Sequence, residues 1–180
     1  MSKLAEVRIT EGDFDVAAEY QKLCESAPKA GAVVFFVGLV RDFYSPKAPG
    51  GDSPQAPGGD SPQACNAQAL DEKIDYLELQ HYPKMTETLC QEIIDQARQR
   101  YSFDAARVVH RVGKIHIAEQ IVMVAVASRN RDKAFQAAEY IMDYLKTRAT
   151  FWKKEVGTRG QHWLGIKDKD LAAAKRWSED

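Results

Sequence analysis

The chain has 180 residues, of which 28% are charged and 44% hydrophobic, and its formal net charge is −1. This length suits one globular domain with a substantial core, and the near-zero charge gives no general attraction to nucleic acid. No apolar run is long enough to span a membrane, and the first residues lack the apolar segment of a signal peptide. We therefore expect a single domain over residues 1–180, located in the cytoplasm, with no nucleic-acid or membrane partner.

The first 41 residues predict two strands and a helix. Alternation of apolar and polar side chains over residues 5–10 is typical of an edge strand, and Asp13 or Asp15 is expected to cap the helix that follows. Residues 32–40, A-V-V-F-F-V-G-L-V, form the most continuous apolar run and predict a central strand. Gly38 within this run indicates a bulge or the close approach of another backbone or a ligand.

A short duplicated segment comes next. Residues 48–55 read A-P-G-G-D-S-P-Q, and residues 56–63 repeat these letters without change. A segment so rich in Pro, Gly, Asp and Ser buries too little apolar surface to order itself. We predict that residues 44–70 are a flexible insertion in a loop between two strands, and a tolerated loop expansion is favoured over a working lid.

The rest of the chain predicts strands interspersed with helices. Residues 73–82 alternate as a half-buried strand, and Pro83 is expected at the first position of a helix that runs to about Arg100. Ser128 or Asn130 is expected to cap a long helix. Further strands are predicted over residues 106–112, 114–117, 120–127 and 162–166, and a terminal helix over residues 171–177. Because regular βα alternation and nucleotide-binding motifs are missing, the predicted fold is α+β, a single domain with a mixed, largely antiparallel sheet and packed helices.

The three cysteines give no sign of chemistry. Cys24, Cys65 and Cys90 are odd in number, form no C-x-x-C pair and have no metal-ligand spacing with the four histidines. Cys24 and Cys90 fall in predicted helices, where the role of a buried small hydrophobic residue is expected. The sequence predicts no metal site and no catalytic cysteine.

The stretch over residues 140–155, Y-I-M-D-Y-L-K-T-R-A-T-F-W-K-K-E, changes from an amphipathic helix to an extended, aromatic-rich segment. Lys146 falls in the last helical turn, where a cation commonly complements the helix dipole, so a purely capping role stays open. Phe151 and Trp152 are costly to expose and are expected to hold the neighbouring lysines, Lys153 among them, against a partly dry surface. A lysine held there is an anion ligand or an amine with a lowered pKa.

Basic side chains are expected to gather at strand and helix ends, where binding sites of α+β domains form. They are Arg41, His110, Arg111, Lys146, Lys153 and Lys154. Arg41 as a solvated boundary residue and His110 as a structural residue are open alternatives. Because His110 and Arg111 are adjacent on a strand, one pocket takes one of them more directly than the other. The cluster suits a small phosphorylated or carboxylated ligand, whereas a nucleic-acid site is disfavoured by the near-zero net charge.

Four sequence motifs occur in order along the chain. Residues 142–153 read M-D-Y-L-K-T-R-A-T-F-W-K, and the patterns F-x-G-x-V-R, H-Y-P-x-M-T-E and H-R-[IV]-G match residues 36–41, 81–87 and 110–113. These motifs resemble those of the large, catalytic subunit of molybdopterin synthase, the MoaE family. The resemblance covers nearly the whole chain apart from residues 44–70, and it implies a hammerhead-like α+β fold.

The resemblance implies sulfur transfer to cyclic pyranopterin monophosphate, which makes the dithiolene of molybdopterin, with no metal or other cofactor. The sulfur is expected to arrive as a thiocarboxylate on the C-terminal Gly-Gly of a small ubiquitin-like subunit. The large subunits are expected to form a central homodimer with one small subunit at each end, a heterotetramer whose pockets borrow residues across the dimer. A non-catalytic module that binds a ubiquitin-like partner or a phosphorylated ligand is the alternative function.

The resemblance also implies roles for individual residues. Lys146 is expected to be the central catalytic lysine near the thiocarboxylate, and Lys153 a second catalytic lysine beside the substrate. Arg41, His110 and Arg111 are expected to grip the phosphate of the pterin, the last two by completing a neighbour's pocket. The other predicted substrate-binding residues are Phe36, Met142, Lys153, Lys154, Glu155 and Lys167, a lysine where an arginine is expected.

Overall fold

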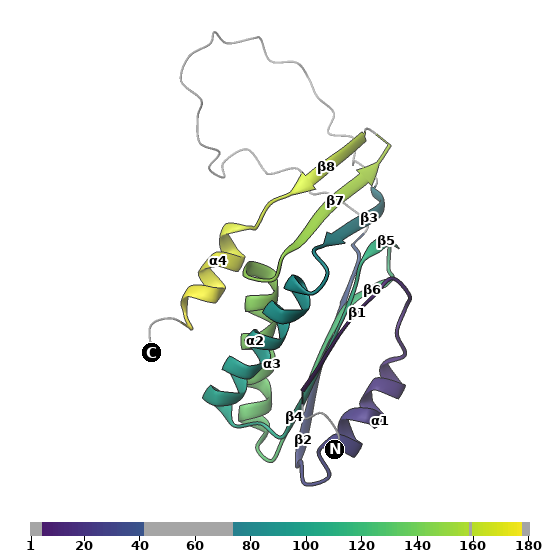
Figure 1. Cartoon of the computed structure of the whole chain (residues 1–180). Helices are drawn as coiled ribbons and strands as arrows, with labels where there is room; N and C mark the ends of the chain where they lie inside the picture. The colour runs from purple at the N-terminus through teal and green to yellow at the C-terminus, as the bar shows by residue number, and fades with distance from the viewer. Residues whose placement is uncertain (1–4, 42–73, 159, 178–180) are drawn as a thin grey trace.

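The computed structural model describes residues 5–41, 74–158 and 160–177. The predicted insertion over residues 44–70, with Cys65, lies outside the described residues. Within the described part, eight strands form two sheets, and helices pack on both faces of the first sheet (Figure 1). The predicted α+β class is confirmed.

Three helices enclose the first sheet and a fourth lies outside them. The helices are α1 (Val16–Ser26), α2 (Met85–Tyr101), α3 (Arg131–Thr147) and α4 (Asp168–Lys175). α1 covers one face of the sheet, α2 and α3 cover the other, and α4 packs against α3 (Figure 1). Asp15 caps α1, because its carboxylate accepts hydrogen bonds from the backbone N–H groups of Ala17 and Ala18 at 2.8 and 3.1 Å.

The first sheet has the strand order β1 (Ala5–Thr10), β4 (Ala105–Arg111), β6 (Gln120–Ser128), β2 (Ala32–Leu39). β1 runs parallel to β4, and the other two pairs are antiparallel. β2 is an edge strand, so the prediction of a central strand is wrong. Its apolar run has another cause: Phe35 packs in the core under α1 and Val34 in the core under α2 and α3, so both faces of this edge meet a helix layer.

The second sheet has the strand order β5 (Gly113–His116), β3 (Ile74–His81), β7 (Phe151–Gly157), β8 (Gly160–Leu164). All its pairs are antiparallel. Val112 alone separates β4 from β5, and Gly113, with φ at +78°, makes the corner. The chain therefore passes from the end of one sheet directly into the other, which brings the ends of β4 and β2 close to β3 and β7.

Two helix boundaries differ from the prediction. α2 begins at Met85, because Lys84 has a positive φ of 64° that lies outside the helical region, and Pro83 lies in the preceding turn rather than at the first helical position. α4 begins at Asp168, earlier than predicted, and the Lys167 carbonyl accepts from the N–H groups of Asp170 and Leu171 at 2.8 and 3.1 Å. The first turn of α4 is charged, so apolar periodicity did not reveal it.

Two apolar clusters hold the helices to the first sheet, one on each face, and a small third cluster lies at the second sheet. Cys90 is fully buried in the larger cluster, where burial raises its thiol pKa to about 12. Its predicted role as a buried small hydrophobic residue is confirmed, whereas Cys24 is only half-buried.

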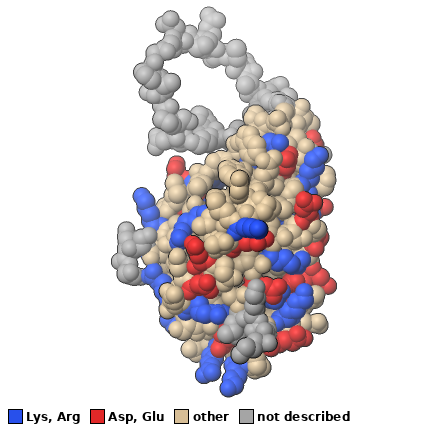
Figure 2. All heavy atoms as spheres, in the orientation of Figure 1, with Lys and Arg blue, Asp and Glu red and all other residues tan. Residues whose placement is uncertain are grey.

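The described residues on the face of the molecule in Figure 2 form no large patch of a single charge sign. On the face in Figure 2, Lys and Arg side chains are interspersed with Asp and Glu. No helix among the described residues is long and apolar enough to cross a membrane.

Candidate functional site

A cavity of about 620 Å³ lies where the two sheets and the end of α3 meet. Its wall includes the last residues of β2, the end of β4, the last turn of α3, the inner face of β7 and the first turn of α4. Leu77, Leu145 and Phe151 contribute apolar surface to this wall. The site is therefore built by segments far apart in the sequence, which the corner between β4 and β5 draws together.

The cavity collects most of the side chains that the sequence predicts for the site. Eight of these predicted residues line it: Phe36, Arg41, His110, Met142, Lys146, Lys153, Glu155 and Lys167. Two others, Arg111 and Lys154, are not part of its wall.

Gly38 lies in the cavity wall, at the bulge of β2. The register of β2 against β6 shifts between Gly38 and Leu39, which confirms the predicted bulge. A Cβ atom on Gly38 would lie 2.9 Å from Cγ1 of Val122, so a side chain here would require the Val122 side chain to shift. The neighbouring group is a side chain, so the alternative prediction, a close approach by another backbone or a ligand, is not what the described residues show at Gly38.

Alternation along β7 separates Lys153 from Lys154. Lys153 points into the cavity with Phe151 and Glu155, at every second position of the strand. Lys154 points to the outer face, where its ammonium is 2.9 Å from a carboxylate oxygen of Glu78 and 5.3 Å from the ring centre of Trp163. The structure therefore places Lys154 in a sheet-surface ion pair, away from the cavity.

Of the two lysines that line the cavity wall at β7 and α3, Lys153 is half-buried and Lys146 is exposed. Burial lowers the pKa of its ammonium, and the nearby positive charges of Lys146 and Lys167 lower it further, while Asp170 opposes them. The lowered pKa increases the fraction of Lys153 that is a neutral amine, able to accept a proton.

Lys146 lies in the last turn of α3, and its side chain is 39% exposed. Its ammonium is 3.5 Å from a carboxylate oxygen of Asp170, in the first turn of α4. Asp170 also lines the cavity, so one carboxylate is set between the two candidate catalytic lysines. The sequence offered no signal for Asp170, because its position depends on how α4 packs against α3.

The His110 ring is 4% exposed and lies flat against Phe151, with ring centres 3.8 Å apart and planes 12° apart. Nδ1 is 2.8 Å from the carbonyl oxygen of Arg111. Burial lowers the pKa of His110 to about 3; Lys153 and His81 act in the same direction, and the hydrogen bond to Arg111 opposes them. His110 is therefore an uncharged imidazole in the wall of its own chain's cavity.

Arg111 points to the opposite face of β4, as the strand alternation predicts. Its guanidinium donates to the carbonyl of Gln120 at 3.1 Å and pairs with carboxylates of Glu119 at 3.3 Å and Asp13 at 3.6 Å. The three predicted phosphate-gripping residues are thus divided within the chain, since Arg41 and His110 line the cavity and Arg111 does not.

The match with known proteins extends over almost the whole chain. The family model described as MoaE protein matches residues 65–148. A molybdopterin synthase catalytic subunit from Vibrio cholerae serotype O1 is 42% identical over 171 residues, 95% of this chain and 97% of the relative. The protein of the same name from Escherichia coli K12 is 38% identical, and the match covers 97% of this chain and 100% of the relative.

A solved structure agrees with these relatives. The molybdopterin biosynthesis MoaE protein from Burkholderia ambifaria superposes with a TM-score of 0.73 at 36% identity, covering 98% of this chain and 99% of that one. With relatives of this identity and coverage in both sequence and structure, the chain belongs to the family of molybdopterin synthase catalytic subunits.

Proposed function

We propose that the chain transfers sulfur from the C-terminal thiocarboxylate of a small ubiquitin-like subunit to cyclic pyranopterin monophosphate, making the dithiolene of molybdopterin. The observation that carries this proposal is the pairing of Lys146 and Lys153 in one cavity, where only one of them has a carboxylate partner within ion-pair distance among the described residues. The relatives are named molybdopterin synthase catalytic subunits, which supports the same reaction.

The cavity suits the phosphate and the pterin ring of the proposed substrate. Its volume of about 620 Å³ falls within the range of roughly 300–1,000 Å³ that small-molecule sites occupy. Arg41 and Lys167 supply positive charge for a phosphate, and the apolar surface of Phe36 and Met142 suits a pterin ring. Lys154 is not part of the proposed site, because Glu78 holds its ammonium on the outer face of β7.

The two lysines have different roles in the proposed reaction. Lys146, next to solvent and to Asp170, is the cation that stabilises negative charge on the carbonyl group as the thiocarboxylate gives up its sulfur. Lys153, whose pKa is lowered by burial and neighbouring cations, is the proton acceptor beside the pterin. The carrier supplies the sulfur, so the chain needs no cysteine nucleophile of its own.

Reconstitution tests the proposal. The purified chain is incubated with cyclic pyranopterin monophosphate and a carrier subunit bearing a C-terminal thiocarboxylate, and the dithiolene product is measured. The same carrier with an ordinary carboxylate is the control. We expect product only with the thiocarboxylate; a chain that binds the thiocarboxylated carrier and the precursor but forms no product is a binding module, not an enzyme.

A further inference from the structure

The packing around His110 fixes both the orientation and the protonation of its ring. Phe151 covers one ring face at a centre-to-centre distance of 3.8 Å, and only 4% of the residue is exposed. The imidazole ring therefore cannot rotate by 180° about its bond to Cβ unless Phe151, the first residue of β7, moves. This rigidity is set by packing alone, independently of any ligand.

The nitrogen atoms of His110 can be assigned from their partners. Nδ1 lies 2.8 Å from the carbonyl oxygen of Arg111, and a carbonyl only accepts, so Nδ1 carries the hydrogen. A neutral imidazole has one N–H, so Nε2 is the unprotonated nitrogen and carries a lone pair. No partner for Nε2 is found in the described residues, although the side chain lines the cavity.

The charges that act on His110 favour this neutral state. Lys153 of β7 and His81 at the end of β3 are the titratable groups that act on the ring, and both disfavour a positive charge there. The cavity that His110 faces is also lined by Arg41, Lys146 and Lys167. A second proton on the imidazole would therefore add one more cation to a crowded set of cations.

We propose that His110 is a fixed, uncharged hydrogen-bond acceptor in the cavity, which presents Nε2 to an N–H or O–H group of the bound pterin and does not bind its phosphate. Phosphate oxygens carry no hydrogen to donate to a lone pair, so the phosphate is left to Arg41 and Lys167. This assignment deepens the proposed function and rests on it for the identity of the ligand. It replaces the phosphate-binding role that the family resemblance implies for His110.

The first test is made on the protein without ligand. Histidine ring nitrogens are labelled with ¹⁵N, and their chemical shifts are followed from about pH 5 to about pH 9, around the ordinary histidine pKa of about 6.5. We expect His110 to show one protonated and one unprotonated nitrogen throughout. A ring protonated on both nitrogens near neutral pH would overturn the assignment.

The second test compares replacements of His110 by their affinity for the precursor. His110→Gln keeps an acceptor at the end of the side chain, whereas His110→Lys introduces a cation and has no acceptor. Losing one hydrogen bond to a buried acceptor weakens binding by roughly tenfold, so we expect His110→Lys to bind at least that much more weakly than His110→Gln. The opposite order would restore the phosphate-binding role, and thermal unfolding checks that both variants are folded.

The two proposals fail in distinguishable ways. If the wild-type chain makes no dithiolene but the ¹⁵N shifts show neutral His110, the proposed function is wrong and the protonation assignment stands. If product forms while His110 proves to be charged, or the lysine variant binds better, the function stands and the role of His110 is wrong.

Discussion

Lys153 and Lys154 are neighbours in the sequence with opposite surroundings. The first is half-buried in a cavity with other cations, and the second is paired with Glu78 on the outer face of β7. The sequence predicted that Phe151 and Trp152 would both hold this segment against a partly dry surface. Phe151 lines the cavity beside Lys153, but Trp152 is 47% exposed, so the prediction is wrong for Trp152. The sequence did not indicate which lysine would face inward, because that depends on the register of β7 against β3.

We predict that Lys146→Ala lowers single-turnover product formation by about 10²–10³, the effect of losing one well-placed charge-stabilising donor. Lys153→Ala should lower it by about 10²–10⁴, the effect of losing a general base. Lys154→Ala is the matched control, because it removes a lysine from the same strand without touching the cavity wall. Its rate should stay within about threefold of wild type. Calorimetric binding of the carrier subunit shows whether the losses lie in the reaction step; near wild-type turnover of Lys146→Ala would leave this lysine as a helix-end cation only.

The rate of the reaction should depend on pH through Lys153. Burial and nearby cations hold its pKa below the usual 10.5, so the neutral amine accumulates as pH rises through that lowered value, and the single-turnover rate should rise with it. Asp170 opposes the lowering, so Asp170→Asn should shift the rising limb to lower pH. Asp168→Asn is the control, at an exposed position of the same helical turn outside the cavity wall. A limb that moves to higher pH in Asp170→Asn would contradict this account.

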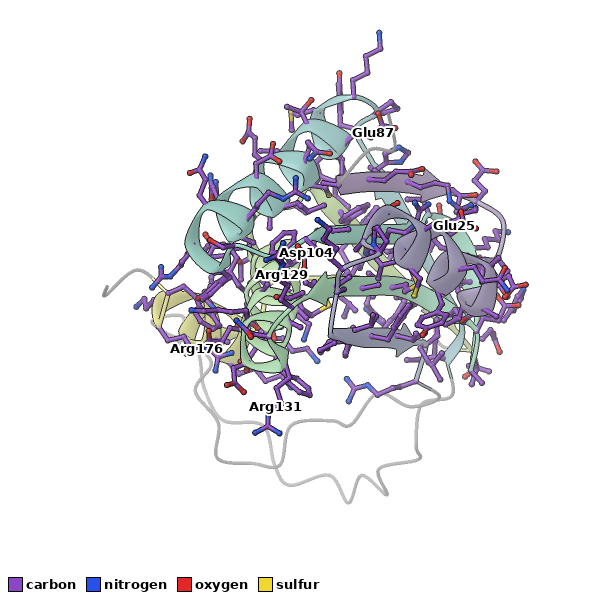
Figure 3. All side chains as sticks on the ribbon, turned by 90° about the horizontal axis from the view of Figure 1, so that it is seen from below. Glu25, Glu87, Asp104, Arg129, Arg131 and Arg176 are labelled. Carbon is purple, nitrogen blue, oxygen red and sulfur yellow. The ribbon has the colours of Figure 1, made fainter. Side chains whose placement is uncertain are left out.

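Helix α4 contributes one wall of the cavity, and the residues that follow its C-terminal end bind it to α3. The Trp177 indole donates to Asp143 at 2.9 Å, and the guanidinium of Arg176 pairs with Asp143 at 2.7 Å and Glu139 at 2.6 Å, both on α3. Figure 3 labels Arg176 at this helix pair. Trp177 also packs edge-on against Tyr101 and Tyr140. The contacts of residues after α4 thus hold Asp170 beside Lys146.

Trp177→Ala should loosen α4 and raise KM for the precursor by roughly tenfold, with a smaller change in kcat, because the cavity wall loses its anchor while Lys153 stays on β7. The control is Arg131→Ala, at an exposed first residue of α3 that points away from the fold in Figure 3. Hydrogen exchange of the α4 amides measures the loosening directly. Unchanged exchange and unchanged KM in Trp177→Ala would show that α4 holds its place without this anchor.

A buried ion network fastens α1 to the first sheet. Glu19 of α1 is 2% exposed, and its carboxylate is 2.7 Å from Arg107, 3.0 Å from Arg8 and 3.2 Å from Lys22. Burial by itself raises the pKa of Glu19, but the hydrogen bonds and charges of the three cations outweigh it and lower the pKa below 4.5. The network therefore stabilises the fold while Glu19 is ionised.

Glu19→Gln should lower the free energy of unfolding by roughly 1–3 kcal/mol, because the buried Arg107 loses one of its two carboxylate partners and keeps the other, Glu6, at 2.7 Å. Because the folded-state pKa of Glu19 is lowered, its ionised carboxylate stabilises the fold above the unfolded-state pKa of 4.5, and this stabilisation is lost as pH falls through the lower folded-state pKa. The variant lacks this carboxylate, so its stability should depend less on pH below 4.5. Denaturant titrations over this range measure both effects. Glu25→Gln, at an exposed site on α1, is the control and should match wild type at every pH.

The sequence patterns predict most of the helices and strands, but they do not predict how these elements are arranged in the two sheets. The apolar run of β2 predicts a central strand, because strands buried on both faces are commonly flanked by two others. Here helices cover both faces of an edge strand, which requires the same apolar side chains. The strands around residue 113 were recognised, but their assignment to two sheets depends on one corner at Gly113. Long-range packing of this kind leaves no periodic trace.

The position of Arg111 suggests that a cavity in one chain is completed by a second chain. Arg111 faces away from its own chain's cavity, and its Nε atom is buried without a hydrogen-bond partner among the described residues. Because this atom is already shielded inside its own chain, the position of Arg111 outside the cavity, together with the shared pockets that the family resemblance implies, is what motivates a dimer. We propose that the chain forms a homodimer in which Arg111 serves the cavity of its neighbour.

Mixed dimers test this arrangement. Arg111→Ala and Lys146→Ala subunits should each be poorly active alone, but a dimer of the two contains one intact pocket, with Lys146 from one chain and Arg111 from the other. Random exchange makes half of the dimers mixed, and half of the pockets in those are intact, so about a quarter of wild-type activity should return. Sedimentation confirms that dimers form, and thermal unfolding checks that Arg111→Ala, which loses the pairs to Glu119 and Asp13, is folded. If exchange is shown by mass labelling and no activity returns, each cavity works with residues of its own chain, and Arg111 is a structural clamp between β4 and the segment before β6.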